Sequence, residues 1–515
     1  MTYFLIGLGV VVGLLVLVAI HDVFIQKKRT LLHNFPVVAR FRYLMEELGP
    51  PLRQYIVAKD TDEKPYDRTT RSWVYQSSKG VNNVIGFGSQ VEHNAPGKMH
   101  ILPSMFPTLD TDVKEEPRPA VIGKKRRQPY QPNSFTNISG MSFGALSEAA
   151  VKALSKGAGK AHIYMGTGEG SLSPHHLAGD CDILYQIGPA KFGVRTEDGK
   201  FDDKKAAQVM ALPQVKMIEI KLAQGAKPGK GGVLPAAKVS AEIAKIRGIP
   251  VGKDCHSPNR FEEFHDAPSL LDFLERVRRL TDKPVGFKMV VGQEEEVEAL
   301  CREIVRRGDG PDCIVVYGKE GGSGAAPLAL ADYVGRPLMD GLTLVDDALR
   351  RHGLRDDVTL IGSGRIATGG EVAIHIALGA DIVHIARGFL FSLGCIQALR
   401  CHTNTCPTGI ATQSRWLQAG LDPADKSERV ANYAKALQKD LGMIIRSVGL
   451  KHPSELHRGH VTVAMSPGVR KTLAEIYPYP QVKVPPRSRA STSIIRRKLL
   501  EDALPTISTN LPPNV

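Results

Sequence analysis

Three cysteines lie close together in the sequence, at a spacing that suits metal binding. Cys395, Cys401 and Cys406 are separated by five and four residues, and Pro407 follows the last of them. Thiolates at such spacing bind zinc or iron–sulfur clusters. Zinc usually takes four ligands with C-x2-C pairs; no fourth cysteine is near, although His402 could serve. Three cysteines suit a 3Fe–4S cluster, because each of three irons then has one protein ligand. A segment without any metal is the remaining interpretation.

Glycine-rich turns follow the candidate strands of the chain. They span 139–145, 166–170, 223–229, 318–324, 362–365 and 386–388. Glycine lets backbone N–H groups approach a ligand closely, and two late turns that lead into helices form the phosphate site of many barrel enzymes. FMN, with one phosphate and one flat ring, suits such a pocket, and Lys288 within its strand can stabilise the reduced anionic ring. The alternative is that each glycine only makes a tight turn.

Short apolar runs alternate with helical patterns from about residue 135 onward. The candidate strands are 137–139, 162–165, 217–221, 285–291, 313–317, 359–361 and 382–386. The candidate helices between them include 269–280, 294–307 and 369–378. This alternation indicates βα units and a parallel sheet. About eight strands, with no G-x-G-x-x-G after a first strand, predict an α/β protein with a (β/α)8 TIM barrel rather than a doubly wound sheet.

The chain begins with an apolar segment that can span a membrane. Tyr3–Ile20 carries no charge, and Val23–Ile25 extends it to the length that about 30 Å of hydrocarbon requires. A cleaved signal peptide is the alternative, but no basic region precedes the run and no small-x-small site follows it. Residues 27–29 are basic, which places the remaining chain in the cytoplasm. We therefore predict a single-pass membrane protein with a signal anchor.

Charge and cysteine content argue against several other classes. The formal net charge is +14, and basic residues gather at 27–29, 124–127 and 487–498. No zinc finger, RNA-recognition signature or helix-turn-helix accompanies them, so attraction to an anionic membrane surface explains the charge better than nucleic acid does. Seven cysteines are too few for a disulfide framework in 515 residues, which indicates a reducing compartment.

These patterns divide the chain into four parts. The predicted parts are 1–26 (transmembrane signal anchor), 27–130 (cap or linker), 131–450 (barrel domain with the cysteine segment 395–406) and 451–515 (extension with a basic tail). An amphipathic helix is expected near 37–48, followed by Gly/Pro-rich stretches that wrap the main domain. Within the basic tail, 494–504 could form a short surface helix.

Several strings resemble the FMN-binding synthase domain of glutamate synthase. They are MSFGALS at 141–147, MGTGEGS at 165–171, EIKLAQGAKPGKGG at 219–232, GSGRIATGGEV at 362–372 and GCIQALRCHTNTCPTGIATQ at 394–413. The similarity runs from about residue 135 to 413, and its last string keeps the family's cysteine spacing. The resemblance implies a TIM barrel with FMN and a 3Fe–4S cluster as cofactors.

The resemblance also implies a reaction and the residues that serve it. In this family, reduced FMN gives a hydride to 2-iminoglutarate, formed from 2-oxoglutarate and ammonia, and L-glutamate results; the cluster passes electrons to FMN. By motif position, Lys227 and Arg247 would hold the carboxylates of the oxo acid, Arg247 in a bidentate manner. Glu169 would link the substrate site to ammonia delivery. The implied flavin-binding residues are Met141, Ser142, Gln224, Lys288, Gly322, Gly362, Gly364, Arg365, Arg387 and Gly388.

The sequence departs from the family in ways that bear on its substrate and partners. Val233 stands where the family has a glutamine that helps to bind the oxo acid. The glutaminase domain, the C-terminal β-helix and an NADPH-binding module are missing from this sequence. The ammonia source and the electron donor, a ferredoxin or a reductase subunit, are therefore expected to be separate proteins. The membrane helix would suit a smaller, stand-alone branch of the family.

Three functions are compatible with the sequence. The first is an FMN- and iron–sulfur-dependent oxidoreductase of the class acting on CH–NH2 donors, which makes glutamate by reductive amination. The second is the same flavoprotein acting on another oxo, imino or amino acid as a membrane-linked dehydrogenase or reductase, which Val233 and the membrane helix favour. The third is a non-catalytic electron-transfer subunit. Lys227, Arg247 and Glu169 argue against the third function, because an electron relay needs no anion pocket.

Overall fold

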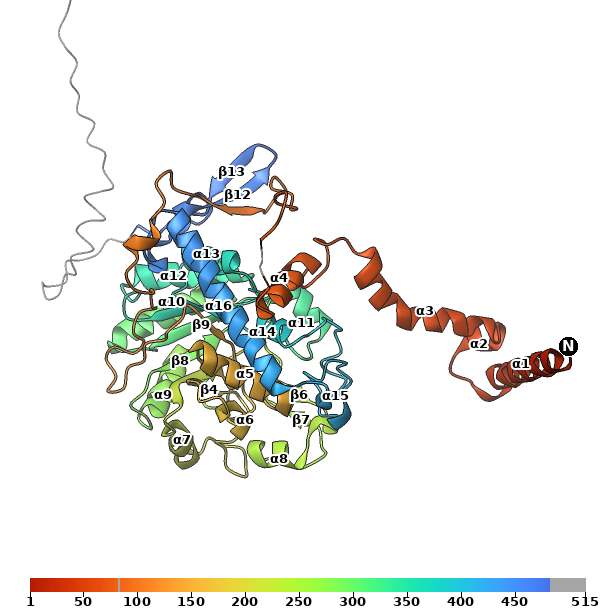
Figure 1. The fold of residues 1–515 in the computed structure, drawn as a ribbon. Coiled ribbons are helices and arrows are strands. Elements are labelled where there is room, and N and C mark those ends of the chain that lie inside the picture. The colour runs from red at the N-terminus through yellow and green to blue at the C-terminus, as the bar shows by residue number, and fades with distance from the viewer. Residues whose placement is uncertain (82–83, 482–515) are drawn as a thin grey trace, which may run out of the picture.

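Eight parallel strands close into a barrel at the centre of the molecule (Figure 1). The computed structural model describes residues 1–81 and 84–481. Around the barrel the strands are β2 (Thr136–Ile138), β3 (Met165–Gly166), β4 (Ile183–Ile187), β5 (Val215–Lys221), β8 (Val285–Met289), β9 (Cys313–Tyr317), β10 (Thr359–Ser363) and β11 (Ile382–Ile385). The predicted α/β class and (β/α)8 TIM barrel are confirmed. The helix expected at 494–504 and the basic tail lie outside the described residues.

Helices cover the outer face of the barrel. They are α5 (Glu148–Ala161), α6 (Pro174–Leu177), α7 (Asp203–Met210), α9 (Ala267–Arg278), α10 (Glu294–Arg307), α12 (Leu338–Arg351), α13 (Gly369–Ala377), α14 (Arg387–Ser392) and α16 (Pro423–Ser447). The main core lies between strands and helices, and a smaller cluster with Tyr164 and Val315 fills the barrel interior. Every residue of β9 is buried, as its unbroken apolar sequence CIVVY requires of a strand covered on both faces.

An insertion between β5 and β8 adds a small layer at the carboxyl ends of the strands. It contains the antiparallel pair β6 (Val233–Leu234) and β7 (Cys255–His256), the 3-10 turn η4 (Ala236–Lys238) and α8 (Ala241–Arg247). Ser240 caps α8 by accepting a hydrogen bond from the backbone N–H of Ile243, and Gly248 ends the helix in the left-handed conformation. These two signals fix the length of α8 and thereby the position of Arg247 in its last turn.

Segments from both ends of the chain join on the outside of the barrel. Strand β1 (Met99–Ile101) pairs with β12 (Val461–Ser466), which pairs with β13 (Val469–Thr472) in an antiparallel sheet. Helix α4 (Arg68–Ser78) packs against α14 and α16. The other short elements are α11 (Leu328–Tyr333), α15 (Arg415–Ala419), α17 (Leu473–Ile476), η3 (Asp110–Asp112), η5 (Pro453–Glu455) and η6 (Arg458–His460).

The N-terminal helices extend away from the barrel (Figure 1). They are α1 (Thr2–Ile20), the π-helical turn η1 (His21–Ile25), α2 (Thr30–Asn34), α3 (Val38–Leu52) and the π-helical turn η2 (Arg53–Val57). Residues Thr2–Ile25 are long and apolar enough to cross a membrane, and the apolar window of 18 residues within this span has no buried residue. A signal sequence has the same length and composition.

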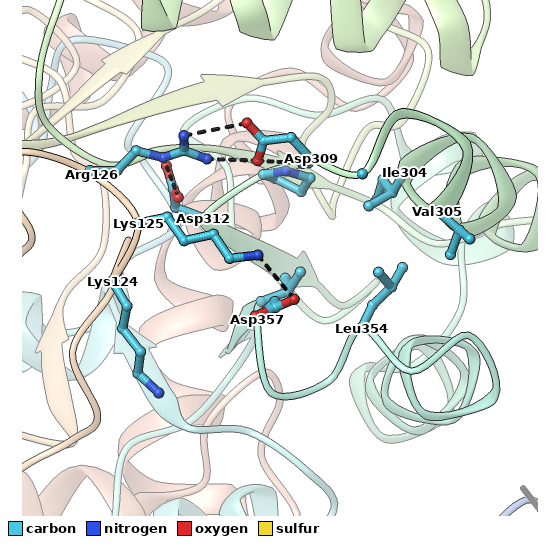
Figure 2. A pocket seen from close by; sticks show the side chains of 13 residues that line it. Lys124, Lys125, Arg126, Ile304, Val305, Asp309, Asp312, Leu354 and Asp357 are labelled. Carbon is cyan, nitrogen blue, oxygen red and sulfur yellow. Dashed lines mark hydrogen bonds and ion pairs between the residues drawn. The ribbon is translucent and has the colours of Figure 1, made fainter. Parts of the chain in front are cut away.

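The basic segment 124–127 lies where strands β9 and β10 begin, at the opposite end of the barrel from their carboxyl termini (Figure 2). Arg126 bonds to Asp309 and Asp312, each at 2.8 Å, and Lys125 bonds to Asp357 at 3.2 Å. These ion pairs close one end of the barrel. They give Lys125 and Arg126 a structural role that the composition of the segment did not reveal.

Candidate active site

A cavity of about 250 Å³ opens at the carboxyl ends of the barrel strands. Active sites of TIM barrels form at this end because the βα loops meet there. The predicted site residues that line it are Met141, Ser142, Glu169, Gln224, Lys227, Arg247, Lys288, Gly322, Arg387 and Cys401. Residues separated by more than 250 positions in sequence thus form one site.

Basic side chains dominate the lining of this cavity. Its lysines and arginines are Lys221, Lys227, Lys238, Arg247, Lys288 and Arg387, whereas Glu169 is its one acidic residue. An excess of buried positive charge is costly unless an anion balances it. The cavity is therefore suited to anionic ligands.

Arg247 is a buried cation without a carboxylate bonded to it. Its side chain is 5% exposed; Nη2 donates to the carbonyl oxygen of Phe143 at 3.1 Å, and Nη1 faces the Cys255 sulfur at 4.0 Å. Nε has no partner among the described residues. Burial lowers the pKa of Arg247, and Glu169 acts in the opposite direction. The guanidinium can thus receive an anion without first breaking an ion pair.

Lys227 is a second buried cation of this kind. It is 5% exposed, and within the described part of the chain its ammonium group makes no hydrogen bond or ion pair. Burial lowers its pKa, while the charge of Glu169 raises it and that of Lys221 lowers it. Lys227 lies near the start of the insertion after β5 and Arg247 lies at the end of α8 in its middle, and both side chains line the same cavity.

A chain of hydrogen bonds orders the loops beside these cations. Lys221 Nζ pairs with Glu169 Oε2 at 3.2 Å and donates to Gln224 Oε1 at 3.3 Å. Gln224 Nε2 in turn donates to the carbonyl oxygen of Gly322 at 2.9 Å. Burial raises the pKa of Glu169, but Lys221 and the other cations outweigh it, and the net pKa is lowered. Glu169 is therefore an ionised carboxylate inside the cavity.

Lys288 lies on β8, inside the mouth of the barrel. Its ammonium group is 3.3 Å from Ser139 Oγ and 4.2 Å from the ring centre of Tyr317. Burial lowers its pKa to about 8, partly offset by the charge of Glu219 on the neighbouring strand. Glu219 accepts a hydrogen bond from Gln186, and its second oxygen has no partner among the described residues.

Close backbone packing holds the first two glycine-rich turns together. Gly168 has φ of +68°, and a Cβ atom there would lie 2.6 Å from the backbone nitrogen of Ser142. A side chain would therefore separate the two turns. This contact keeps Met141 and Ser142 beside Glu169 in the cavity wall.

Four of the predicted flavin-binding residues do not line the cavity: Gly362, Gly364, Arg365 and Gly388. A Cβ at Gly362 would face Ala380 and Leu342, and a Cβ at Gly388 would clash with Tyr433. Arg365 bonds to the carbonyl oxygen of Pro65 and lies over Tyr66, whose ring also lies beneath Arg387 at 4.9 Å. Gly362 lies within β10, Gly364 and Arg365 follow it, and Gly388 follows β11. Of Gly362 and Gly388, Gly388 is the one that packs too closely to accept a side chain.

The three cysteines lie next to the cavity. Burial raises the pKa of Cys395 to about 12, and the nearby thiols of Cys401 and Cys406 also raise it. Cys401 lines the cavity, whereas Cys395 and Cys406 do not. Lys238 donates hydrogen bonds to the carbonyl oxygens of Cys401 and Ala411, at 2.7 and 2.8 Å. This buried lysine fixes the cysteine segment against the inserted layer.

The N-terminal segment holds the cysteine segment from the other side. Tyr75 donates to the carbonyl oxygen of Cys395 at 2.5 Å, and Gln54 donates to that of Ile396 at 3.0 Å. Gln397 donates to Glu63 at 2.8 Å. Residues more than 300 positions apart thus position the cysteines together.

Among the described residues, one group of three side chains places its possible metal-binding atoms within 4.8 Å of one another. The group consists of Glu148, His175 and Glu242. His175 is already bonded to Glu242 at 2.8 Å, and Glu148 is paired with Lys152. The three cysteine sulfurs form no such group. Ligands of a single zinc ion would lie closer together than that limit, given zinc–sulfur bonds of about 2.3 Å.

Sequence reasoning missed several residues of the site, above all Lys221, Lys238, Tyr317 and Glu219. Two of them were visible as a signal: the strand string EIK puts Glu219 and Lys221 inside an otherwise apolar strand, and both are buried. Charged residues inside a barrel strand indicate a functional interior. Lys238 and Tyr317 gave no comparable signal.

The sequence belongs to the glutamate synthase family. The family described as the conserved region in glutamate synthase matches residues 97–451. The glutamate synthase large subunit-like protein YerD of Bacillus subtilis is 40% identical over 481 residues, which cover 86% of this chain and 91% of that protein.

More distant relatives share the same region. The archaeal glutamate synthase (NADPH) of Methanocaldococcus jannaschii is 38% identical over 319 residues, which cover 61% of this chain and 58% of that protein. Among solved structures, a flavocytochrome b2 variant with sulfite bound is 15% identical, with a TM-score of 0.45, over 89% of this chain and 95% of that chain.

Proposed function

We propose that this protein is a flavin-dependent oxidoreductase that makes L-glutamate from 2-oxoglutarate and ammonia, with FMN in the barrel cavity and a 3Fe–4S cluster on the three cysteines. The observation that carries the proposal is the pair of buried, unpaired cations Lys227 and Arg247 in a cavity that also holds Lys288. Bound FMN would supply hydride transfer. The names of the relatives support this reaction class.

The lining fits FMN in charge and in chemistry. Lys288 is 2% exposed, and Ser139 is the one described residue within hydrogen-bond distance of its ammonium group, so its charge is available to an electron-rich ring. Arg387 and Gly322 line another part of the cavity, beside the turns after β9 and β11. Arginine beside a glycine turn suits a phosphate group. Met141, Ser142 and Gln224 would then contact the flavin.

Lys227 and Arg247 would bind the two carboxylates of the oxo acid. Arg247 presents a free Nε edge, and Lys227 presents an ammonium group without a partner. Glu169, kept ionised by Lys221, would accept a hydrogen bond from ammonium and hold it beside the oxo acid. Glu169 would thus offset the positive charge of the cavity where ammonium binds, and the two reactants would be concentrated beside each other.

The cysteine segment would hold the 3Fe–4S cluster next to the flavin. Cys401 lines the cavity and the other two thiols lie near it, so electrons would have a short route between cluster and flavin. The sequence spacing of the three cysteines, without a C-x2-C pair, supports a cluster rather than zinc. The three protein ligands of the cluster would be Cys395, Cys401 and Cys406.

A second candidate is the same chemistry on another oxo acid. Val233 lines the cavity and is 40% exposed, so an apolar side chain stands at its mouth. An acid with an apolar distal group would contact it favourably, whereas the second carboxylate of 2-oxoglutarate would not.

The helix Thr2–Ile25 would anchor the protein in a membrane with the barrel in the cytoplasm, since positive residues follow it. A separate ferredoxin or reductase subunit would supply electrons, and ammonia would come free or from a separate protein. A purely electron-transferring role is disfavoured. Burial of the charges of Lys227 and Arg247 destabilises the fold, and an electron relay binds no anion that would offset this.

The test is an anaerobic turnover assay on the detergent-solubilised protein. The flavin is reduced, and its absorbance and glutamate are followed after addition of 2-oxoglutarate, ammonium or both. The proposal expects reoxidation and glutamate only with both reactants. Reoxidation with another oxo acid but not with 2-oxoglutarate would favour the second candidate, and none with any acid would contradict both.

Iron and sulfide analysis tests the cluster. Cys406→Ala should remove the cluster iron while the flavin stays bound. The matched control is Cys301→Ala, a buried cysteine of α10 away from the cavity, which should leave iron unchanged. Equal iron in both variants would exclude the cysteines as ligands.

A further inference from the structure

Helix α3 presents a continuous apolar face to solvent. Val38, Phe41, Met45, Leu48 and Leu52 recur at spacings of three and four residues, so they share one side of the helix. Val38 is 76% exposed and Phe41 65%. The opposite side carries Glu47 and other charged residues. Apolar exposure of this extent marks an interaction surface.

Buried polar contacts fix α3 to the end of the membrane helix. Asp22, in the turn η1 that follows α1, is 0% exposed and accepts hydrogen bonds from Arg40 at 3.0 Å and from the Val37 backbone nitrogen at 3.1 Å. Arg29 lies over the ring of Tyr43 at 4.3 Å. The start of α3 is therefore bonded to the end of the apolar span, which gives the helix a defined orientation to it.

The charges around α3 match an anionic lipid surface. Residues 27–29 are Lys, Lys and Arg, and they supply the basic excess next to α3. Within α3 the two arginines are balanced by Glu46 and Glu47. Arg42 is paired with Glu46, and Arg40 with Asp22. Basic residues near an apolar helix face attract the headgroups of anionic lipids. A second copy of this chain is a poorer partner for the same face, because α3 has 15 residues and contains Pro50 and Pro51, whereas a stable coiled coil needs about three or four heptads.

We propose that α3 lies in the membrane interface, with the apolar face of Val38, Phe41, Met45, Leu48 and Leu52 in the lipid headgroup region. The inference rests on the membrane anchor proposed above and deepens it. Burying this face would remove its exposed apolar side chains from water.

This position of α3 has a consequence for the cysteine segment. Directly after α3, Gln54 donates to the carbonyl oxygen of Ile396 at 3.0 Å, next to Cys395. Tyr75 holds Cys395 from the following helix. The cysteine segment is therefore bonded to the part of the chain that follows α3 as well as to the barrel.

Tryptophan quenching in vesicles tests the proposal on the full chain. Phe41→Trp and its matched control Glu47→Trp place a fluorophore on the apolar and the charged side of α3. Leu14→Trp places one within the span. Each variant is reconstituted in phosphatidylcholine/phosphatidylglycerol vesicles with brominated acyl chains, and the emission of Trp73 and Trp416 in the parent protein is subtracted.

The proposal expects Phe41→Trp to lose about half of its added emission, as a side chain at the acyl boundary would, while Glu47→Trp loses little. Quenching of Leu14→Trp without quenching of Phe41→Trp would leave the anchor intact and overturn the interfacial helix. Quenching of none of the three would overturn the anchor itself. A disulfide between copies of a Phe41→Cys variant, with Phe41→Trp unquenched, would show that a second copy covers the face.

Discussion

The two ends of the barrel use basic residues in opposite ways. Where strands β9 and β10 begin, Arg126 is paired with Asp309 and Asp312, and Lys125 with Asp357 (Figure 2). At the carboxyl ends of the strands, six lysines and arginines line a cavity with one acidic residue. Positive charge alone therefore does not distinguish a ligand site from a structural contact in this protein.

The presence of carboxylate partners is what separates the two ends. A paired and hydrogen-bonded cation stabilises the fold, and removing it leaves buried carboxylates uncompensated. An unpaired buried cation such as Arg247 opposes folding and is useful only when an anion arrives. The predictions below follow from this difference.

The largest expected effect is the loss of substrate binding in Arg247→Met. Removal of a charged hydrogen-bonding group that contacts the substrate should lower kcat/KM by about 100-fold. The melting temperature should not fall, because the variant no longer buries an unpaired charge. Steady-state kinetics and thermal denaturation measure both effects. Lys245→Met, an exposed residue of the same helix, is the control, and equal kcat/KM in both variants would contradict the assignment.

Arg126→Met should show the reverse pattern. Asp312 is 5% exposed and would lose its bond to Arg126, so the free energy of unfolding should fall by about 3 kcal/mol. Denaturant titration measures this loss, and kcat/KM should be unchanged. Lys125→Met breaks the exposed pair with Asp357 and should cost less than about 1 kcal/mol. A loss of activity without a loss of stability in Arg126→Met would contradict the purely structural role of the basic residues at this end of the barrel.

The contribution of Lys288 to the stability of the fold should depend on pH. Burial lowers its pKa from 10.5 to about 8, so between these values the unfolded chain binds more protons than the folded protein. Stability of the cofactor-free protein should therefore rise with pH in that window, and charged Lys288 should destabilise the fold below it. Melting temperatures of the parent and of Lys288→Met measure the difference. Parallel pH profiles of the two proteins would contradict a buried, charge-sensitive lysine.

Val233→Gln should have the smallest effect. A polar group at the mouth of the cavity should improve kcat/KM for 2-oxoglutarate relative to a monocarboxylic oxo acid by about fivefold, because Val233 is partly exposed. The control Val251→Gln changes an exposed valine outside the lining. If the ratio of the two kcat/KM values stays constant, Val233 has no part in selecting the acid.

The barrel could be predicted from the sequence because its strands are short, apolar and followed by glycine-rich turns. Strand β4 was missed: ILYQI is buried on both faces, so it shows no alternation, and Gln186 interrupts its apolar run. The strand expected at 162–165 begins only at Met165, because His162 ends α5 in the left-handed conformation with φ of 54°.

Glu169 follows β3 and Lys288 lies within β8, so the strand pattern alone was enough to expect both side chains at the mouth of the barrel, where they line the cavity. Arg247 reaches the cavity only through the insertion after β5, whose packing no local pattern indicates. The bonds from Gln54 and Tyr75 to the cysteine segment join residues more than 300 positions apart, and periodicity carries no information on such contacts.

The most direct test of the account is a titration of 2-oxoglutarate into the oxidised, flavin-bound protein, followed by flavin absorbance. If the cations at the carboxyl end of the barrel bind the acid beside the flavin, the spectrum should change in a saturable manner. The change should require much more acid in Arg247→Met and be unaltered in Arg126→Met. An unperturbed spectrum, or equal titrations in all three proteins, would contradict the claim that the unpaired cations form the substrate site.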